Sequence, residues 1–252
     1  MAKYSDIKIS GGDTDEPINL QRRVRVAARF LSEHPCRLLD CGCGSGGYVE
    51  ALDTLPHIRA YGLEFEASKV RRARRRIIAS SRVVQGDIQT MPYADNSFDA
   101  VLLNEVLEHV PDQNRGLKEV NRVLRPGGRL LVFSPNRFYP FETHGVILLK
   151  GGKRIPIHTP FIPWIPLPLG EKFLTYPARN YWPGELRELL KAHGFEIIET
   201  DFIWQTFEGT SGTQPTWIRN TSGLLRKLSM TLEKVPLIKG MGVSQFIAAT
   251  KR

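Results

Sequence analysis

The amino-acid sequence predicts an α/β fold in which a seven-stranded, mostly parallel sheet is flanked by helices. Two observations support this prediction. Short apolar runs bounded by glycine and polar turns alternate with stretches of helical periodicity. A glycine-rich loop stands between the first of these apolar runs and the next helical stretch, as in parallel sheets with crossover helices. With 252 residues, 41% of them hydrophobic, residues 1–252 fit one domain with an insertion.

The first half of the chain is expected to supply four strands separated by helices, because each apolar run is followed by a stretch of helical period. In chain order the predicted elements are a helix over residues 19–32, a strand over 37–41, a helix from Gly47, a strand over 59–64, a basic helix over 68–80, and strands over 82–86 and 98–104.

The second half is expected to complete the sheet around an insertion after the fifth strand. The segment over residues 136–180 is rich in proline and glycine and lacks clear periodicity, which is typical of an insertion. The other predicted elements are a helix over 114–124, a Pro126-Gly127-Gly128 turn, a strand over 129–134, a helix over 183–193 that stops at Gly194, and strands over 196–203 and 244–250.

The loop DCGCGSGG at residues 40–47 follows an apolar strand and opens a helix, so its glycines allow a ligand to lie against the backbone. Gly42, Gly44 and Gly47 also satisfy the G-x-G-x-x-G pattern, with Glu64 at the end of the next strand, as in dinucleotide-binding dehydrogenases. The loop by itself is therefore also compatible with a nicotinamide cofactor.

Polar residues at the ends of the third and fourth strands favour a smaller, zwitterionic cofactor. Gly86-Asp87 ends the third strand and Asn104-Glu105 ends the fourth, so acidic and amide groups line successive strand ends. A dehydrogenase remains the rival interpretation, and a cofactor-binding module without catalytic activity is a further one.

Together these motifs resemble the class I S-adenosylmethionine-dependent methyltransferases, especially the ubiquinone-biosynthesis O-methyltransferases. The resemblance is strong over residues 36–136, in LLDCGCGSG, YGLEFE, QGDIQTMPYADNSFDAVLLNEVLEHVPD and LRPGGRLLVFSPN, and weak over 180–252. It implies a Rossmann-like fold and S-adenosylmethionine as cofactor. It also implies that Asp40, Gly42, Gly44 and Gly46 meet the methionine part, Glu64 accepts the ribose hydroxyls, Asp87 and Ile88 hold the adenine, and Asn104 lies beneath the sulfonium.

The segment EVLEH follows the fourth strand, where the methyl group is expected. Glu105 precedes His109 by four residues, so both can face one side of a helical turn. Two carboxylates and an imidazole can hold Mg²⁺, Mn²⁺ or Zn²⁺, which lowers the pKa of a coordinated hydroxyl. Without a metal, His109 is the candidate general base, with Glu105 as its partner.

This E-x-x-E-H segment resembles the metal-binding segment of small-RNA 3′-terminal 2′-O-methyltransferases and also matches the ubiquinone type. In the RNA enzymes another histidine follows the fifth strand, and here His144 is the first candidate and His158 the second. The resemblance thus implies Glu105, Glu108, His109 and His144 as metal ligands. The same motif also occurs in proteins where no metal has a role.

The insertion is expected to cover the acceptor site, with an ordinary cover of the sheet edge as the alternative. An apolar cover over the site favours a lipophilic acceptor. The apolar run within the insertion is too short to span a membrane. The apolar and aromatic residues concerned are Phe161, Ile162, Trp164, Ile165, Leu167, Leu169, Phe173, Tyr176, Tyr181 and Trp182.

A formal net charge of +9 favours anionic surroundings. The predicted helix over 68–80 carries Lys69, Arg71, Arg72, Arg74, Arg75 and Arg76. This run is either a solvated helix face, a contact with anionic membrane, or, third, a contact with RNA. The N-terminus lacks the pattern of a secretory signal, so we expect a cytoplasmic protein, with a position peripheral to the membrane as the alternative. The expected activity is O-methylation of a lipophilic or lipid-linked small molecule, with RNA ribose 2′-O-methylation as the alternative.

Overall fold

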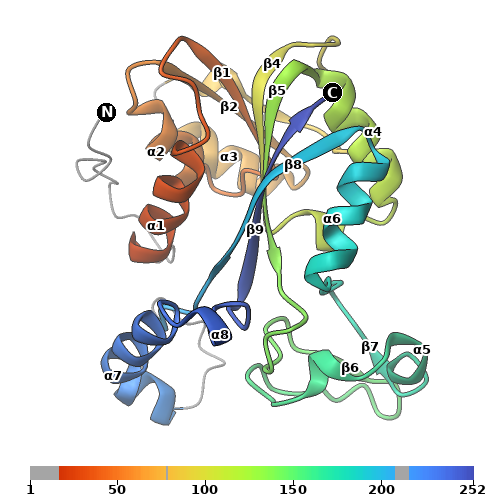
Figure 1. The fold of residues 1–252 in the computed structure, drawn as a ribbon. Coiled ribbons are helices and arrows are strands. Elements are labelled where there is room, and N and C mark those ends of the chain that lie inside the picture. The colour runs from red at the N-terminus through yellow and green to blue at the C-terminus, as the bar shows by residue number, and fades with distance from the viewer. Residues whose placement is uncertain (1–16, 78, 208–215) are drawn as a thin grey trace.

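The computed structural model describes residues 17–77, 79–207 and 216–252 (Figure 1). Most of its strands lie close to the predicted ranges, and the fourth matches its range to the residue. The fifth begins at Leu124, five residues before its predicted start, and includes the Pro126-Gly127-Gly128 segment that was expected to be a separate turn. The main strands are β1 (Cys36–Cys41), β2 (Ile58–Glu64), β3 (Val83–Gln85), β4 (Phe98–Asn104), β5 (Leu124–Pro135), β8 (Phe195–Ile203) and β9 (Ser244–Lys251). The helices around them are α1 (Pro17–Ala28), α2 (Gly47–Asp53), α3 (Ala67–Arg76), α4 (Gln113–Val123), α6 (Pro183–Ala192), α7 (Thr216–Leu232) and α8 (Pro236–Lys239).

The strands form one seven-stranded sheet in the order β3-β2-β1-β4-β5-β9-β8. The first five strands pair in parallel, β9 runs antiparallel to β5, and β8 runs antiparallel to β9. This arrangement confirms the predicted Rossmann-like, mostly parallel sheet. It also brings the carboxyl ends of β1 and β4, which are neighbours in the sheet, to the same edge.

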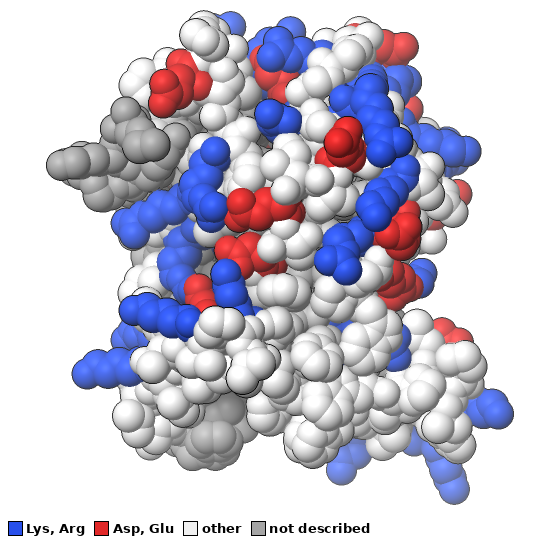
Figure 2. All heavy atoms as spheres, viewed as in Figure 1, with Lys and Arg blue, Asp and Glu red and all other residues white. Residues whose placement is uncertain are grey.

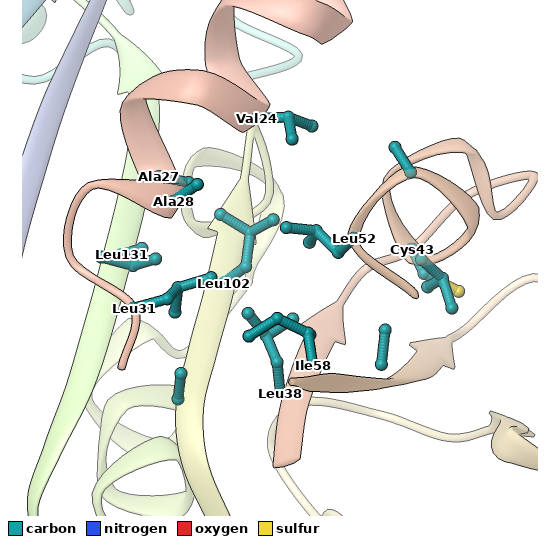
Figure 3. Packing of buried hydrophobic residues seen from close by; sticks show 14 of the residues in the cluster. Val24, Ala27, Ala28, Leu31, Leu38, Cys43, Leu52, Ile58, Leu102 and Leu131 are labelled. Atoms are coloured by element: carbon teal, nitrogen blue, oxygen red, sulfur yellow. The ribbon is translucent and has the colours of Figure 1, made fainter. Parts of the chain in front are cut away.

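Both faces of the sheet are buried, which explains why its central strands are nearly continuous apolar runs. Leu38, Leu102 and Leu131 pack on one face with residues of α1 and α2, and Val24 of α1 lies in the same cluster (Figure 3). On the opposite face, strand residues such as Leu103 pack with residues of α4 and α6. The two-residue period of the strands assigns successive side chains to opposite layers.

The insertion has secondary structure that its irregular sequence did not predict. A small antiparallel sheet joins β6 (Ile147–Leu148) to β7 (Leu174–Thr175), and the segment between them contains η4 (Ile162–Trp164) and α5 (Leu167–Gly170). The buried Arg137 ties this segment to β5, because its guanidinium donates to the carbonyl oxygens of Pro163 at 2.8 Å and Ile165 at 2.5 Å.

Helices α7 and α8, between β8 and β9, were not predicted from the sequence. Like the insertion, they lie beyond the sheet at the end where the carboxyl ends of β5 and β8 are found (Figure 1). None of the helices described by the structure is long and apolar enough to cross a membrane.

Candidate active site

The glycine loop between β1 and α2 is left-handed at three positions. Gly42, Gly44 and Gly46 have φ values of 83°, 55° and 87°, which L-residues with a side chain rarely adopt. A Cβ on Gly42 would lie 2.4 Å from Cγ2 of Val106, whereas a Cβ on Gly44 would meet nothing within 4 Å. The loop is therefore packed tightly against the chain after β4 and is open at Gly44.

Glu64 ends β2 beside this loop. Its carboxylate accepts hydrogen bonds from the backbone N–H of Gly44 and of Glu66, both at 2.9 Å. Each oxygen keeps a free lone pair, so the carboxylate can still accept from a ligand. Its proposed role toward ribose hydroxyls stays a prediction.

Asp40, the penultimate residue of β1, is 1% exposed, and its Oδ2 has no hydrogen-bond partner. Burial, with a smaller contribution from the charge of Glu64, raises the pKa of Asp40 to about 8. A buried, unpaired carboxyl group is costly, and a cationic ligand group such as an ammonium would relieve this cost.

The two residues after β3 lie in a turn beside the sheet. Asp87 accepts a hydrogen bond from the backbone N–H of Gln89 at 2.8 Å, and Ile88 packs into the core. Ile88 can thus offer an apolar surface, and Asp87 an acceptor, at the strand end where the resemblance places the adenine. No contact in the structure tests this assignment.

The segment after β4 differs from the expected helical turn. Glu105 has a left-handed φ of 54°, and a 3₁₀ turn, η3, covers only Leu107–His109. The prediction that Glu105 and His109 share one side of a helical turn is therefore wrong. The carboxyl group of Glu105 nevertheless stays beside that of Glu108, with which it can share a hydrogen bond when Glu108 is protonated.

Glu105 points to two residues from distant parts of the chain. Its Oε1 lies 2.9 Å from Nη2 of Arg23 on α1 and accepts a hydrogen bond from the hydroxyl of Ser244 on β9 at 2.8 Å. Arg23 also donates to Oδ1 of Asn104 at 2.7 Å. The carboxylate of Glu105 is thus neutralised by an ion pair with Arg23. Among the described residues, the potential metal ligands that lie close together do not include Glu105.

Glu108, His109 and His144 do come together. One potential ligand atom from each lies within 4.8 Å of the others, and the two imidazole rings are 5.4 Å apart. Glu108 is buried, and no described N–H or hydroxyl group donates to its carboxylate oxygens, while its carboxyl group lies beside that of Glu105. Burial first, and then the nearby charge of Glu105, raise the pKa of Glu108, while burial lowers the pKa of His144. His158, the second histidine candidate, lies elsewhere, with its ring 6.5 Å from that of Phe207.

A groove of about 580 Å³ lies beside Glu108 and His109, between the segment after β4 and the insertion. One wall comes from η3 and the start of α4, and the other comes from the end of the insertion. Its lining residues are Glu108, His109, Val110, Pro111, Asp112, Gln113, Asn114, Leu167, Glu171, Tyr176, Pro177, Ala178 and Arg179.

Comparison with known proteins shows the family to which this chain belongs. Residues 39–132 match the family described as "Methyltransferase domain". A demethylmenaquinone methyltransferase of Deinococcus radiodurans is 36% identical over 188 residues, which is 69% of this chain and 73% of that protein. The chain belongs to the class I S-adenosylmethionine-dependent methyltransferases.

Two further relatives match this methyltransferase, and each is covered over a smaller share of its own length. A 27-O-demethylrifamycin SV methyltransferase of Amycolatopsis mediterranei is 39% identical over 46% of each chain. A probable S-adenosylmethionine-dependent methyltransferase of Mycolicibacterium smegmatis is 31% identical over 71% of this chain, which spans only 60% of that protein.

A solved S-adenosylmethionine-dependent methyltransferase from Mesorhizobium loti has the same fold, with a TM-score of 0.58, 17% identity, and coverage of 90% of this chain and 96% of that one. The family implies S-adenosylmethionine as the cofactor of this methyltransferase. A nicotinamide dehydrogenase, the rival interpretation of the glycine loop, is thereby set aside.

Sequence reasoning missed Arg23 in the methyltransferase, although a signal was present. The predicted helix was noted as rich in arginine, but no single arginine was distinguished. Arg23 follows Leu20 by three residues and precedes Ala27 by four, so it shares the apolar face of α1. A charged residue in the middle of an apolar helix face indicates a buried partner.

Proposed function

We propose that this methyltransferase transfers a methyl group from S-adenosylmethionine to a hydroxyl group of a lipophilic small molecule. One observation carries the proposal: the buried Glu108 carboxyl, which accepts no hydrogen bond from the described residues, lies close to His109 and His144, and Glu108 and His109 line a groove after β4. A hydroxyl acceptor needs a group that takes up its proton, and this cluster supplies candidate groups on the acceptor side.

In the reaction, the acceptor oxygen attacks the methyl carbon in line with the bond to sulfur. The carbon–sulfur bond breaks, its electron pair stays on sulfur, and the sulfonium becomes the thioether S-adenosylhomocysteine. The hydroxyl proton must leave as the carbon–oxygen bond forms. His144, whose pKa burial lowers, is held neutral and able to accept that proton, and the more exposed His109 is the second candidate.

The same three side chains fit a divalent cation. Imidazole and carboxylate are suitable ligands for Mn²⁺ or Zn²⁺, and the unpaired oxygens of Glu108 are available for a ligand. We therefore propose Glu108, His109 and His144 as the ligand set, without Glu105, whose carboxylate is paired with Arg23. A bound cation would lower the pKa of the acceptor hydroxyl and orient it.

The composition of the insertion supports a lipophilic acceptor. Between residues 155 and 170 it has no lysine, arginine, aspartate or glutamate, and its continuation lines the groove beside Glu108 and His109. Two similar proteins are named as a demethylmenaquinone methyltransferase and a 27-O-demethylrifamycin SV methyltransferase. We propose that residues 136–180 cover the acceptor and that the acceptor is a lipophilic small molecule.

RNA ribose 2′-O-methylation is the second candidate function. The grouping of Glu108, His109 and His144 favours it, because it matches three of the four ligands implied by the resemblance to the RNA enzymes. The exposed Arg71, Arg72 and Arg75 of α3 also suit a polyanion.

We further propose a peripheral contact with anionic membrane through the insertion. The lower part of the molecule in Figure 2 is largely uncharged, with basic side chains at its border. On α3, by contrast, Val70 and Ala73 are buried, so this helix offers charge without apolar area. The large exposed apolar residues of the insertion are Phe138, Phe141, Ile147, Leu149, Phe161, Trp164, Leu169 and Phe173, and the nearby cations are Lys150, Lys153, Arg154 and Lys172.

Co-sedimentation with phosphatidylglycerol vesicles tests the membrane contact. Phe161→Ser with Phe173→Ser should reduce binding more than Arg71→Gln with Arg75→Gln, because insertion of aromatic side chains adds to the charge attraction. No binding of the unchanged protein would refute the contact. Equal losses from both pairs would refute the role of the insertion.

Chelation separates the two modes of proton removal. If a metal orients the acceptor, EDTA should abolish turnover and Mg²⁺, Mn²⁺ or Zn²⁺ should restore it, while the affinity for S-adenosylhomocysteine stays unchanged. If a histidine acts alone, EDTA should have no effect, and His109→Ala or His144→Ala should cost roughly a hundredfold or more. Full activity of both Glu108→Ala and His144→Ala would refute the role of the whole cluster.

A further inference from the structure

Arg23 connects the N-terminal helix to the floor of the proposed cofactor site. Its guanidinium donates to Oδ1 of Asn104 at 2.7 Å and lies 2.9 Å from Oε1 of Glu105. The side chain is 8% exposed, and the guanidinium carbon lies 5.3 Å from the centre of the Phe133 ring. One planar fork therefore holds two consecutive residues at the point where the chain leaves β4.

These two residues contact the glycine loop through their neighbour. Val106 is the residue that a Cβ on Gly42 would strike at 2.4 Å, so residues 104–106 and the loop have little freedom to move apart. Glu105 holds its left-handed φ of 54° while bonded to Arg23 and Ser244. An unusual backbone conformation persists where its surroundings fix it, and here the fixing groups come from α1 and β9.

Arg23 also sets the charge of this region. Without the guanidinium, the Glu105 carboxylate would be an uncompensated negative charge in a largely buried place. S-adenosylmethionine carries a positive sulfonium, whereas S-adenosylhomocysteine carries a neutral thioether. A free Glu105 charge would therefore change the affinities of the two cofactor forms unequally.

We propose that Arg23 is a positioning residue of the methyltransferase, which fixes Asn104 and Glu105 at the cofactor floor and balances the charge of Glu105 against the sulfonium. The inference deepens the proposed function only on its cofactor side. It requires that the family cofactor binds above Asn104, and it does not depend on the acceptor, the metal or the membrane.

Calorimetric titration of the full chain with both cofactor forms tests the proposal. Arg23→Met should weaken both, but S-adenosylhomocysteine more, so that the ratio of its Kd to that of S-adenosylmethionine rises at least threefold. Arg23→Met with Glu105→Gln should return the ratio to the value of the unchanged protein. Arg23→Lys, which keeps the charge but loses the fork, should hold the ratio near that value while still weakening both forms.

Arg29→Met is the matched control, because Arg29 follows the same helix, is half exposed and pairs with Glu199 on β8. It should leave both affinities unchanged. Equal weakening of both cofactor forms by Arg23→Met, with no recovery in the double variant, would show a merely structural role and overturn the proposal. If Arg23→Met does not fold, Glu105→Gln and Arg23→Lys are compared instead. The ratio of the Kd of S-adenosylhomocysteine to that of S-adenosylmethionine should then be lower in Glu105→Gln than in Arg23→Lys, and equal ratios would overturn the proposal. These titrations measure cofactor binding alone, so their outcome is independent of whether the proposed acceptor is correct.

Discussion

The carboxylate of Glu64 accepts a hydrogen bond from the backbone N–H of Gly44 at 2.9 Å, which joins the end of β2 to the loop after β1. This bond orients the carboxylate over the most open part of the glycine loop, where a Cβ would meet nothing within 4 Å. The geometry brings together two residues that the sequence could only place at successive strand ends.

Glu64→Ala should weaken binding of S-adenosylhomocysteine by about 1–3 kcal/mol, because it removes the acceptor proposed for the ribose hydroxyls and frees the loop. Calorimetric titration measures this change. Glu66→Ala is the control, since Glu66 is exposed and pairs with Lys69. Unchanged affinity in the Glu64 variant would contradict the assignment.

Asp40 should make the stability of the cofactor-free protein fall as pH rises. Its pKa is raised to about 8 in the folded chain, against about 3.9 when unfolded. Between these values the unfolded chain loses the proton and the folded chain keeps it, so the stability contributed by the protonated form is lost as pH rises toward 8. Relative to Asp40→Asn, the unchanged protein should lose up to about 4 kcal/mol between pH 5 and pH 8, at about 1.4 kcal/mol per pH unit.

Thermal unfolding of both proteins across this pH range measures the difference. Saturating S-adenosylmethionine should reduce the slope, because its ammonium group would favour the ionised carboxylate. A difference in Tm between the two proteins that is the same at pH 5 and pH 8 would contradict the raised pKa.

Much of the sheet could be predicted from the sequence, because strands that are buried on both faces are nearly continuous apolar runs. The predicted range 98–104 coincides with β4, and 59–64 is one residue short of β2. The positions of Asp40, Gly42 and Glu64 at strand ends followed from the same pattern. Their contacts with one another did not, because side-chain direction at a strand end depends on the loop geometry.

The rest could not be predicted because it depends on contacts between distant parts of the chain. The left-handed φ of Glu105 is stabilised by Arg23 and Ser244, which lie 82 positions before it and 139 after it, and no local pattern marks this conformation. The segment around His144 has no periodicity, so its approach to His109 could be suggested only by resemblance. Helix α7 was missed although Pro215, a residue typical of helix starts, directly precedes it in the sequence.

Gly42→Ala should be more damaging than Gly44→Ala. Both glycines have left-handed backbones, so either change costs about 1–2 kcal/mol in conformational strain. Only at Gly42 would the new methyl also overlap Val106, at 2.4 Å from its Cγ2. Chemical denaturation of the two variants and of Gly42→Ala with Val106→Ala measures the effect. The double variant should recover about 1 kcal/mol or more relative to additivity, and strictly additive losses would contradict this packing.

The most direct test of the proposed reaction is to follow the methyl group. The protein is incubated with S-adenosylmethionine labelled in its methyl group, together with either an organic-solvent extract or the total RNA of the same cells. We predict that label appears in an organic-soluble compound that gains one methyl group on oxygen, and that Glu108→Ala abolishes transfer while the exposed Glu188→Ala on α6 does not. Label that enters RNA instead, or organic-soluble label that persists undiminished in Glu108→Ala, would contradict the proposed function.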